Sequence, residues 1–271
     1  MNKLQEFNAL FGTEKPIVGM VHLPPLPGSP FYDGTGLGRV VDKAMADVDS
    51  LVYGGVDAIQ VENYHDPSYF VNEAAYETVA AMSIVAEKIR ERYPNLAMGI
   101  CLLADPYASI AVAHCVRAQF IRATFFSEAS VDVGGLVLRS PHKLLRYRKF
   151  LDPSIKIFAD VHIKHSAPLV MRPIEDSAYD AAYFCADAVI ISGKRTGGVT
   201  DIEDVKKVKE LLPNYPVMVG SGLNVDNAET FFRYADGSFV GSSLKVDGDA
   251  DNDVDKERVA AFMERMKSLR A

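Results

Sequence analysis

Short apolar runs alternate with longer stretches of helical pattern along most of the chain. In the longer stretches apolar residues recur every three or four positions, as at Val41, Ala44, Val48 and Leu51, which indicates one buried face of a helix. We predict strands at residues 17–21, 57–63, 97–103, 120–126, 156–163, 187–192, 216–222 and 237–243. We predict helices at residues 40–52, 73–93, 107–118, 141–151, 174–185, 200–212, 227–235 and 254–270.

Eight strand–helix units therefore follow one another. Strands that alternate with helices pair in parallel through right-handed crossovers. Eight such units in about 250 residues favour an α/β fold of the (β/α)8 TIM-barrel type over an open, doubly wound sheet. We predict a single domain over residues 1–271, in which residues 1–15 form a short N-terminal helical extension and residues 16–271 form the barrel.

Three of the connections that follow predicted strands are long, at residues 23–38, 127–141 and 193–201. The connections from each helix to the next strand are short. In a TIM barrel the loops at the carboxyl ends of the strands build the active site, and long loops in compact domains are usually functional or disordered. We therefore expect function at this end of the barrel.

Two similar segments, VGSGL at residues 219–223 and VGSSL at residues 240–244, end the seventh and eighth predicted strands. Glycines let backbone N–H groups approach a ligand closely, and these two loops are the frequent phosphate site of TIM barrels. The segment SGKRTGG at residues 192–198 adds a cation that could meet a phosphate or a developing oxyanion. The alternative is that small residues merely permit tight turns and that the cation is solvated. The candidate phosphate-binding residues are Gly220, Ser221, Gly222, Gly241, Ser242, Ser243 and Lys194.

Three ionisable residues, Asp160, His162 and Lys164, occupy alternate positions at the end of the fifth predicted strand. The positions between them are apolar and suit the face that the helices cover. We therefore expect the three ionisable side chains to point into the barrel, where charged groups need partners. The expected partners lie near the ends of other predicted strands: His22, Glu62 and Arg122.

Several kinds of chemistry suit this group. Glu62, Asp160 and His162 could ligate a divalent metal, because carboxylates and imidazoles are suitable ligands. The same residues could act as general acid and base, with Lys164 or Arg122 supporting a carboxylate or phosphate. Lys164 could also form a Schiff base if burial lowers its pKa. A purely structural network of ion pairs inside the barrel is the alternative.

The composition is that of an ordinary globular protein, with 48% hydrophobic and 24% charged residues. The formal net charge of −7 argues against non-specific binding to nucleic acid or to an anionic membrane, although a local basic pocket could bind a small anion. No stretch approaches about 18 uninterrupted apolar residues, so we expect no membrane insertion. The N-terminal segment lacks the apolar region of a signal peptide. Three widely spaced cysteines favour a reducing compartment, and we expect a cytoplasmic protein.

The segment VGMVHLPPLPGSP at residues 18–30 resembles the opening signature of the BtpA family. DAIQVEN, ADVHIKH and VGSGL are similar to the same family, so the resemblance covers almost the whole chain. The resemblance implies a TIM barrel. Cyanobacterial members are linked to photosystem I biogenesis, and other members are encoded among sugar-uptake genes. The resemblance implies no particular reaction and no catalytic residues, so the site predictions rest on barrel geometry.

Two functional hypotheses follow. The first is an enzyme, a lyase, isomerase or hydrolase, that acts on a small phosphorylated metabolite, with a sugar phosphate as the expected substrate. A divalent metal is its one candidate cofactor. The second is a non-enzymatic assembly factor, related to photosystem I biogenesis, that acts through a protein partner. Assembly into a homo-oligomer stays open under both. The candidate catalytic residues are Asp160, His162, Glu62, Lys164, His22 and Arg122.

Overall fold

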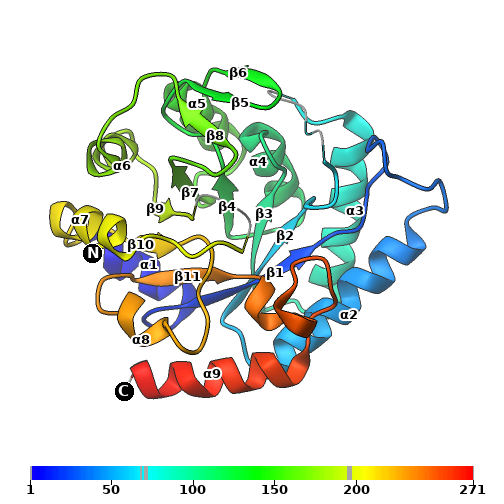
Figure 1. Ribbon diagram of the computed structural model, residues 1–271. Coiled ribbons are helices and arrows are strands. Elements are labelled where there is room, and N and C mark those ends of the chain that lie inside the picture. Colours follow the sequence, from blue (N-terminus) through cyan, green and yellow to red (C-terminus); the bar gives the residue numbers. More distant parts are fainter. Residues whose placement is uncertain (1, 68, 70–72, 194–196, 271) are drawn as a thin grey trace.

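The computed structural model is a closed barrel of eight parallel strands surrounded by helices (Figure 1). It describes residues 2–67, 69, 73–193 and 197–270. The first strand pairs with the last and with the second, which closes the barrel and confirms the predicted TIM fold. The barrel strands are β1 (Ile17–His22), β2 (Ala58–Glu62), β3 (Ala97–Cys101), β4 (Phe120–Ala123), β7 (Lys156–Val161), β9 (Ala188–Ile191), β10 (Val217–Val219) and β11 (Gly237–Val240).

A helix on the outside of the barrel follows each barrel strand, as predicted. The eighth strand is first followed by two short 3-10 helices, η1 (Ser242–Leu244) and η2 (Val246–Gly248). None of the helices in the described part of the chain combines the length and the apolar character needed to cross a membrane. The outer helices are α2 (Gly38–Gly54), α3 (Tyr76–Arg92), α4 (Pro106–Cys115), α5 (Pro141–Leu151), α6 (Ile174–Tyr183), α7 (Ile202–Leu211), α8 (Ala228–Phe231) and α9 (Lys256–Arg270).

Apolar side chains pack in two layers, one inside the strands and one between the strands and the helices. Successive residues of a strand alternate between the layers: Ile157 belongs to the outer layer and Phe158 to the inner one. Inside the barrel the rings of Phe120 and Phe158 are stacked, with their centroids 4.8 Å apart. The predicted N-terminal extension is helix α1 (Lys3–Phe11), and its Phe7 ring lies 5.6 Å from that of Phe158. Helix α1 therefore covers the amino-terminal end of the barrel.

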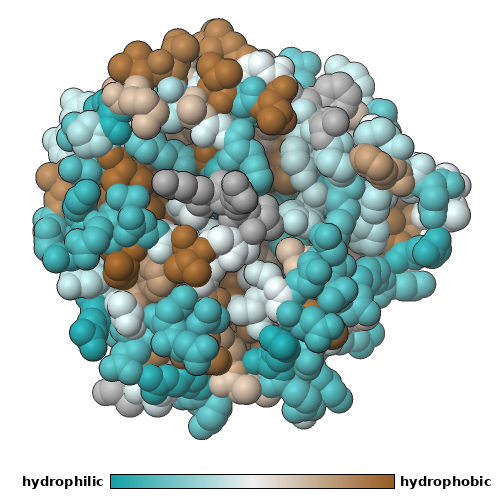
Figure 2. Space-filling model, viewed as in Figure 1, coloured by the Kyte–Doolittle hydropathy of each residue, from teal (hydrophilic) through white to brown (hydrophobic). Residues whose placement is uncertain are grey.

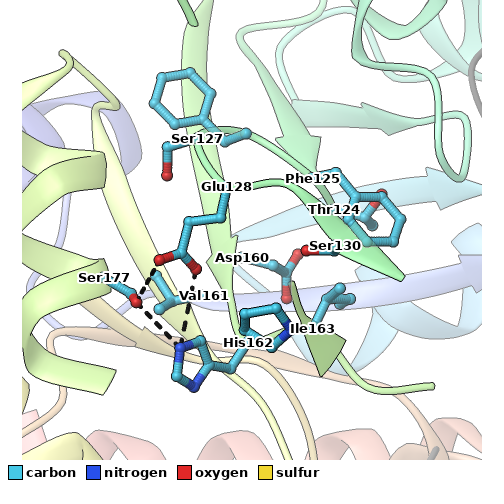
Figure 3. A pocket seen from close by; sticks show the side chains of 12 residues that line it. Thr124, Phe125, Ser127, Glu128, Ser130, Asp160, Val161, His162, Ile163 and Ser177 are labelled. Carbon is cyan, nitrogen blue, oxygen red and sulfur yellow. Dashed lines mark hydrogen bonds and ion pairs between the residues drawn. The ribbon is translucent and has the colours of Figure 1, made fainter. Parts of the chain in front are cut away.

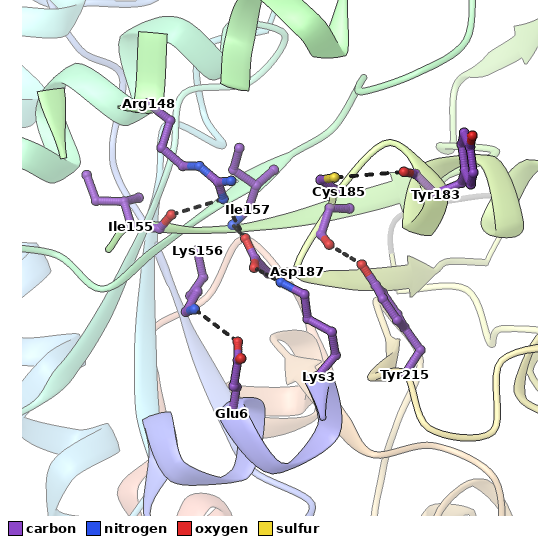
Figure 4. A network of polar contacts seen from close by, with 11 residues as sticks. Lys3, Glu6, Arg148, Ile155, Lys156, Ile157, Tyr183, Cys185, Asp187 and Tyr215 are labelled. Atoms are coloured by element: carbon purple, nitrogen blue, oxygen red, sulfur yellow. Dashed lines mark hydrogen bonds and ion pairs between the residues drawn. The ribbon is translucent and has the colours of Figure 1, made fainter. Parts of the chain in front are cut away.

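An aspartate immediately before a strand joins neighbouring strands at this end. Asp187 precedes β9, and its Oδ2 accepts a hydrogen bond from the backbone N–H of Ile157 on β7 at 3.0 Å. The same carboxylate pairs with Lys3 on α1 at 2.7 Å and with Arg148 on α5 at 2.6 Å (Figure 4). One buried carboxylate thus connects two strands and two helices.

The same arrangement recurs at two other strands. Asp57 precedes β2, accepts from the Ile17 N–H on β1 at 2.7 Å, and pairs with Arg270 of α9. Asp236 precedes β11 and accepts from the backbone N–H of Val217 on β10 at 2.9 Å. It also pairs with Lys209 of α7 at 2.7 Å. In each case a carboxylate accepts a hydrogen bond from a backbone N–H near the start of the adjacent strand. Without the carboxylate this N–H would lack a partner.

A three-stranded antiparallel sheet lies beside the carboxyl ends of β4 and β7 and was not predicted. It consists of β5 (Ser130–Asp132), β6 (Gly135–Val137) and β8 (Ser166–Pro168), with β5 in the centre. The sequence analysis assigned residues 127–141 to a loop. Three-residue strands are too short to show a clear alternation, so their pairing is decided by the turn at residues 132–135 and by contacts with the barrel.

Apolar side chains are exposed on and beside this small sheet. Val133 is 95% exposed, Met171 is 72% exposed and Val170 is 69% exposed. Figure 2 shows this apolar surface at the top of the view. In contrast, Val137 of β6 is fully buried in a small cluster with Phe125 and Ile163. The sheet therefore packs on the barrel mouth through one face and leaves apolar groups exposed elsewhere.

Candidate functional site

One pocket at the carboxyl ends of the strands brings together most of the predicted site residues, and we call it the mouth pocket. Its volume is about 50 Å³. A single water molecule needs about 10–15 Å³ by this measure, so the pocket has room for a group of several heavy atoms. The predicted residues on its wall are His22, Glu62, Arg122, Lys164, Gly220, Ser221, Gly222, Gly241 and Ser242. The other described lining residues are Met20, Tyr64, Gly197, Phe239 and Ala250.

The two glycines of the loop after β10 are needed for two different reasons. A Cβ at Gly220 would clash with Ser192 Oγ and Ile190 Cγ2, so no larger residue fits between these strands. Gly222 has a φ of +75°, which favours glycine. In contrast, a Cβ at Gly241 would lie 3.5 Å from its nearest neighbours, an ordinary contact distance. The prediction that small residues permit close packing therefore has support at Gly220, whereas Gly241 leaves space that belongs to the pocket.

Four backbone N–H groups on these loops have no hydrogen-bond acceptor among the residues that the structure describes. Ser221, Gly222, Gly241 and Ser242 all line the mouth pocket, and no described residue accepts a hydrogen bond from any of their four amides. Such a concave group of N–H donors is typical of anion-binding sites. The predicted Lys194 lies outside the described residues.

The serine hydroxyls on these loops are already used in the protein. Ser221 Oγ accepts from the Gly193 N–H at 3.0 Å and donates to the Gly198 carbonyl at 3.1 Å. Ser243 Oγ donates to the Leu223 carbonyl at 2.7 Å, and Ser243 does not line the pocket. Ser243, a predicted phosphate-binding residue, therefore lies outside the mouth pocket with its hydroxyl engaged. An anion in this pocket would bind mainly to backbone amides.

Arg122 and Asp160 form a bidentate ion pair inside the barrel. Arg122 Nε and Nη2 donate to the two carboxylate oxygens of Asp160 at 2.7 and 2.8 Å, and Ser192 Oγ donates to Oδ1 at 3.1 Å. Both side chains are buried. Burial opposes the charged form of Arg122, but the adjacent Asp160 carboxylate dominates and raises the pKa of the guanidinium. Because both Asp160 oxygens are engaged, Asp160 positions Arg122, and only Arg122 lines the mouth pocket.

His162 points away from the mouth pocket, contrary to the prediction. Strand β7 ends at Val161, and His162 has a φ of +50°, a left-handed conformation that interrupts the alternation of the strand. Its Nε2 lies 3.1 Å from Ser177 Oγ on α6 and 3.9 Å from Glu128 Oε2 (Figure 3). Ser177 Oγ donates to Glu128 at 2.6 Å, so it is the acceptor for the His162 N–H.

The predicted metal set of Glu62, Asp160 and His162 is also contradicted. Both oxygens of Asp160 are engaged by Arg122 and Ser192, and the imidazole of His162 lies in the separate cavity beside α6. In the part of the chain that the structure describes, no three His, Cys, Asp or Glu side chains are close enough to hold a metal ion. The carboxylate of Glu62 lies in the mouth pocket and accepts from Gln60 Nε2 at 3.0 Å.

Lys164 lies beyond the end of β7 but lines the mouth pocket, as predicted from its position. Burial lowers the pKa of its amino group, and the nearby Arg122 lowers it further, while Glu62 and Asp160 act in the opposite direction. Its ammonium makes no hydrogen bond or ion pair with any residue in the described ranges. A lowered pKa increases the fraction of neutral amine, which is the form that reacts as a nucleophile.

His22 is buried at the pocket wall in a defined orientation. Its Nδ1 lies 3.2 Å from the Ala250 carbonyl, and its ring stacks on Tyr64 with centroids 4.2 Å apart. A carbonyl only accepts, so Nδ1 bears the hydrogen, and the neutral ring has its lone pair on Nε2. Burial lowers the pKa of His22 well below its usual range, and the positive charge of Lys245 lowers it further. The ring is therefore neutral and can accept a proton at Nε2.

A model of the BtpA family matches residues 13–268. The chain belongs to the BtpA family. It is 39% identical over 259 residues to an uncharacterized protein of Methanocaldococcus jannaschii, a match that covers 95% of this chain and 97% of the relative. It is 35% identical over 261 residues to Photosystem I biogenesis protein BtpA of Synechocystis, covering 94% of this chain and 89% of that protein. The resemblance inferred from residues 18–30 is confirmed.

Solved structures with the same fold are more distant. KGPDC from Streptococcus mutans superposes with a TM-score of 0.58 at 16% identity, covering 96% of this chain and 100% of that chain. Phosphoribosyl anthranilate isomerase from Thermus thermophilus superposes with a TM-score of 0.56 at 14% identity, covering 94% and 100%. At these identities the similarity shows only that this BtpA-family chain shares the TIM-barrel fold.

Sequence reasoning missed two residues of this BtpA-family site. Ser192, which supports Asp160, ends the sixth predicted strand and has the same parity as the inward-facing Ile190, so strand alternation could have identified it. Lys245 is 1% exposed and donates to the Ala250 carbonyl at 2.6 Å, the same oxygen that His22 contacts. Burial lowers the Lys245 pKa to about 8. It lies in an irregular segment after β11, where the sequence provides no periodic signal.

Proposed function

We propose that this protein is an enzyme that acts on a small phosphorylated metabolite. In this proposal the phosphate binds to the loops after β10 and β11. The observation that supports it best is the set of four backbone amides without an acceptor among the described residues, at Ser221, Gly222, Gly241 and Ser242. These are the two loops that bind phosphate in many TIM barrels.

Two cations on the same wall support the assignment. Arg122 has one carboxylate partner, and Lys164 has no hydrogen bond or ion pair with a described residue. A doubly charged phosphate would stabilise the charged form of Lys164, which burial opposes. An anion in the mouth pocket would therefore satisfy both the amides and the ammonium.

The reacting groups in the proposal are Lys164, Glu62 and His22, which line the same pocket. The neutral amine of Lys164 can attack a carbonyl to form an imine with loss of water, or the ammonium can donate a proton. The Glu62 carboxylate and the His22 Nε2 can accept a proton from the adjacent carbon. This set suits a lyase or isomerase that forms a carbanion beside a carbonyl better than it suits a metal-dependent hydrolase.

Isothermal titration calorimetry tests the phosphate site directly. We expect inorganic phosphate and ribose 5-phosphate to bind, and ribose to give no heat under the same conditions. The Gly241→Ala variant places a methyl group in the pocket at ordinary contact distances, so it should bind phosphate at least about tenfold more weakly. Urea denaturation of the same preparation checks that the variant is folded.

Gly38→Ala is the matched control, because a Cβ added to Gly38 would have no heavy atom within 4 Å. Gly38 is the first residue of α2 and is distant in sequence from the loops after β10 and β11. Equal phosphate affinity in Gly241→Ala and Gly38→Ala would contradict the phosphate site. Binding of ribose as tight as that of ribose 5-phosphate would do the same.

The assembly-factor hypothesis is the alternative, because a relative that is 35% identical is named as a photosystem I biogenesis protein. It requires a partner protein and no ligand in the mouth pocket. Absence of binding by any phosphorylated compound, in a folded protein, would favour it over the enzyme.

A further inference from the structure

A second and larger space adjoins the mouth pocket, and we call it the outer cleft. Its volume is about 1030 Å³, against about 50 Å³ for the mouth pocket. Four residues line both spaces: Glu62, Tyr64, Arg122 and Lys164. A ligand held by its phosphate in the mouth pocket would therefore pass these residues and extend into the outer cleft.

The walls of the outer cleft differ in chemistry from those of the mouth pocket. Phe125 is 8% exposed and Ile163 is 9% exposed, and both pack against the buried Val137 of the small sheet. Because these side chains are packed in one cluster, they form an apolar wall that is present without a ligand. The main apolar lining residues are Phe31, Tyr69, Leu103, Phe125, Val133 and Ile163.

The charged groups of the cleft do not suggest a second phosphate site. Its two cations of fixed charge, Arg122 and Lys164, are the ones it shares with the mouth pocket, where they face the proposed phosphate. Beyond the shared residues the cleft is lined by Asp132 and Asp251, and the Asp251 carboxylate lies 3.4 Å from His65 Nε2. These two carboxylates disfavour another anion, and a bare sugar would leave the apolar wall in contact with water. The volume lies at the upper end of the range for small-molecule sites, which is about 300–1,000 Å³.

We propose that the phosphorylated ligand bears a planar aromatic or heteroaromatic ring and that this ring lies in the outer cleft. A nucleoside monophosphate carries such a ring beside a phosphate. It serves as a probe of binding alone, because its sugar has no free carbonyl to react. The inference rests on the proposed function, since it takes the phosphate site as given. The ring is buried against the wall around Phe125 and Ile163, where apolar contact and ring stacking add affinity. The phosphate remains on the loops after β10 and β11, with the ribose beside Lys164 and Glu62.

Calorimetric titration with a matched set of probes tests this proposal. AMP and UMP should bind at least about tenfold more tightly than ribose 5-phosphate, while adenosine, which has no phosphate, should bind more weakly than AMP. Equal affinities for AMP, UMP and ribose 5-phosphate would overturn the ring site and leave the phosphate site standing. Absence of binding by all four compounds would overturn both proposals.

A pair of phenylalanine variants locates the ring. Phe31 lines the outer cleft and is 63% exposed, so Phe31→Ala should fold normally. We expect it to weaken AMP binding severalfold and to leave ribose 5-phosphate binding unchanged. Phe150→Ala is the matched control, because Phe150 is 82% exposed on α5 and does not line the cleft. Loss of ribose 5-phosphate binding in Phe31→Ala, or an equal effect of both variants on AMP, would contradict the assignment.

Discussion

The two ends of the barrel differ in how their buried polar groups are paired. At the amino-terminal end, Asp187 receives hydrogen bonds from Lys3, Arg148 and the Ile157 backbone (Figure 4). At the mouth, four backbone amides and the Lys164 ammonium have no acceptor within the described ranges. Buried polar groups that are satisfied within the protein stabilise the fold, whereas donors left without acceptors in a concave site are available to a ligand. The difference separates an end whose polar groups hold the fold together from the end at which we propose a ligand site.

The Arg122–Asp160 pair is the exception at the mouth, and its removal should have the largest effect on stability. Asp160→Ala leaves the Arg122 guanidinium buried without a counter-charge, which should cost about 3–5 kcal/mol of unfolding free energy. Urea denaturation measures the loss. The double variant Arg122→Met with Asp160→Leu should recover most of it, because replacing a whole buried pair by apolar groups is often neutral. A stable Asp160→Ala protein would show that the pair is not needed for folding.

At the opposite end, Asp187→Asn should lower the unfolding free energy by about 1.5–3 kcal/mol, because hydrogen bonds to a charged group are lost. Asp226→Asn, at an exposed position before α8, is the control and should unfold at the wild-type urea concentration. Asp187→Asn should leave affinity for ribose 5-phosphate unchanged. A loss of that affinity would mean that the two ends are coupled.

Lys164→Met should have the opposite effects to Asp187→Asn: it should weaken ligand binding and leave stability intact. Stability should stay the same or rise slightly, because the variant removes an amine whose charged form burial disfavours. Affinity for ribose 5-phosphate should fall at least about tenfold. Calorimetry and urea denaturation on the same preparation check both parts. A large loss of stability with normal affinity would place Lys164 with the structural charges.

Lys245→Met should raise the pKa of His22, because it removes a positive charge that disfavours the imidazolium. An NMR titration of the imidazole resonances measures the change. Lys267→Met on α9 is the control, since its side chain is 72% exposed, and it should leave the titration of His22 unchanged. An unshifted pKa of His22 in Lys245→Met would contradict the contribution of the Lys245 charge.

The lowered pKa of His22 also makes the unfolding free energy of the protein depend on pH. The unfolded chain takes up this proton near pH 6.5, whereas the folded protein does so only at lower pH. This contribution to stability is therefore present above about pH 6.5 and is lost as the pH falls below it. His22→Gln should make the unfolding free energy less dependent on pH between about 6.5 and 5. An unchanged pH dependence would contradict the burial of a neutral His22.

Local periodicity determined most of the fold from the sequence. The eight apolar runs and the helical stripes between them predicted the barrel, because side-chain alternation and helical spacing are properties of the chain itself. The parity of β7 correctly placed Asp160 inside the barrel, and the two glycine-rich segments correctly located the loops of the mouth pocket.

Tertiary structure decided the positions of site residues that lie where the backbone departs from regular strand geometry. The positive φ of His162 ends the alternation of β7 and turns its ring toward Ser177, a residue 15 positions away on α6. Lys245 meets His22 only because β1 and β11 close the barrel and bring the Ala250 carbonyl between them. Strand ends and chain closure depend on contacts between distant segments, so no local pattern in the sequence encodes them.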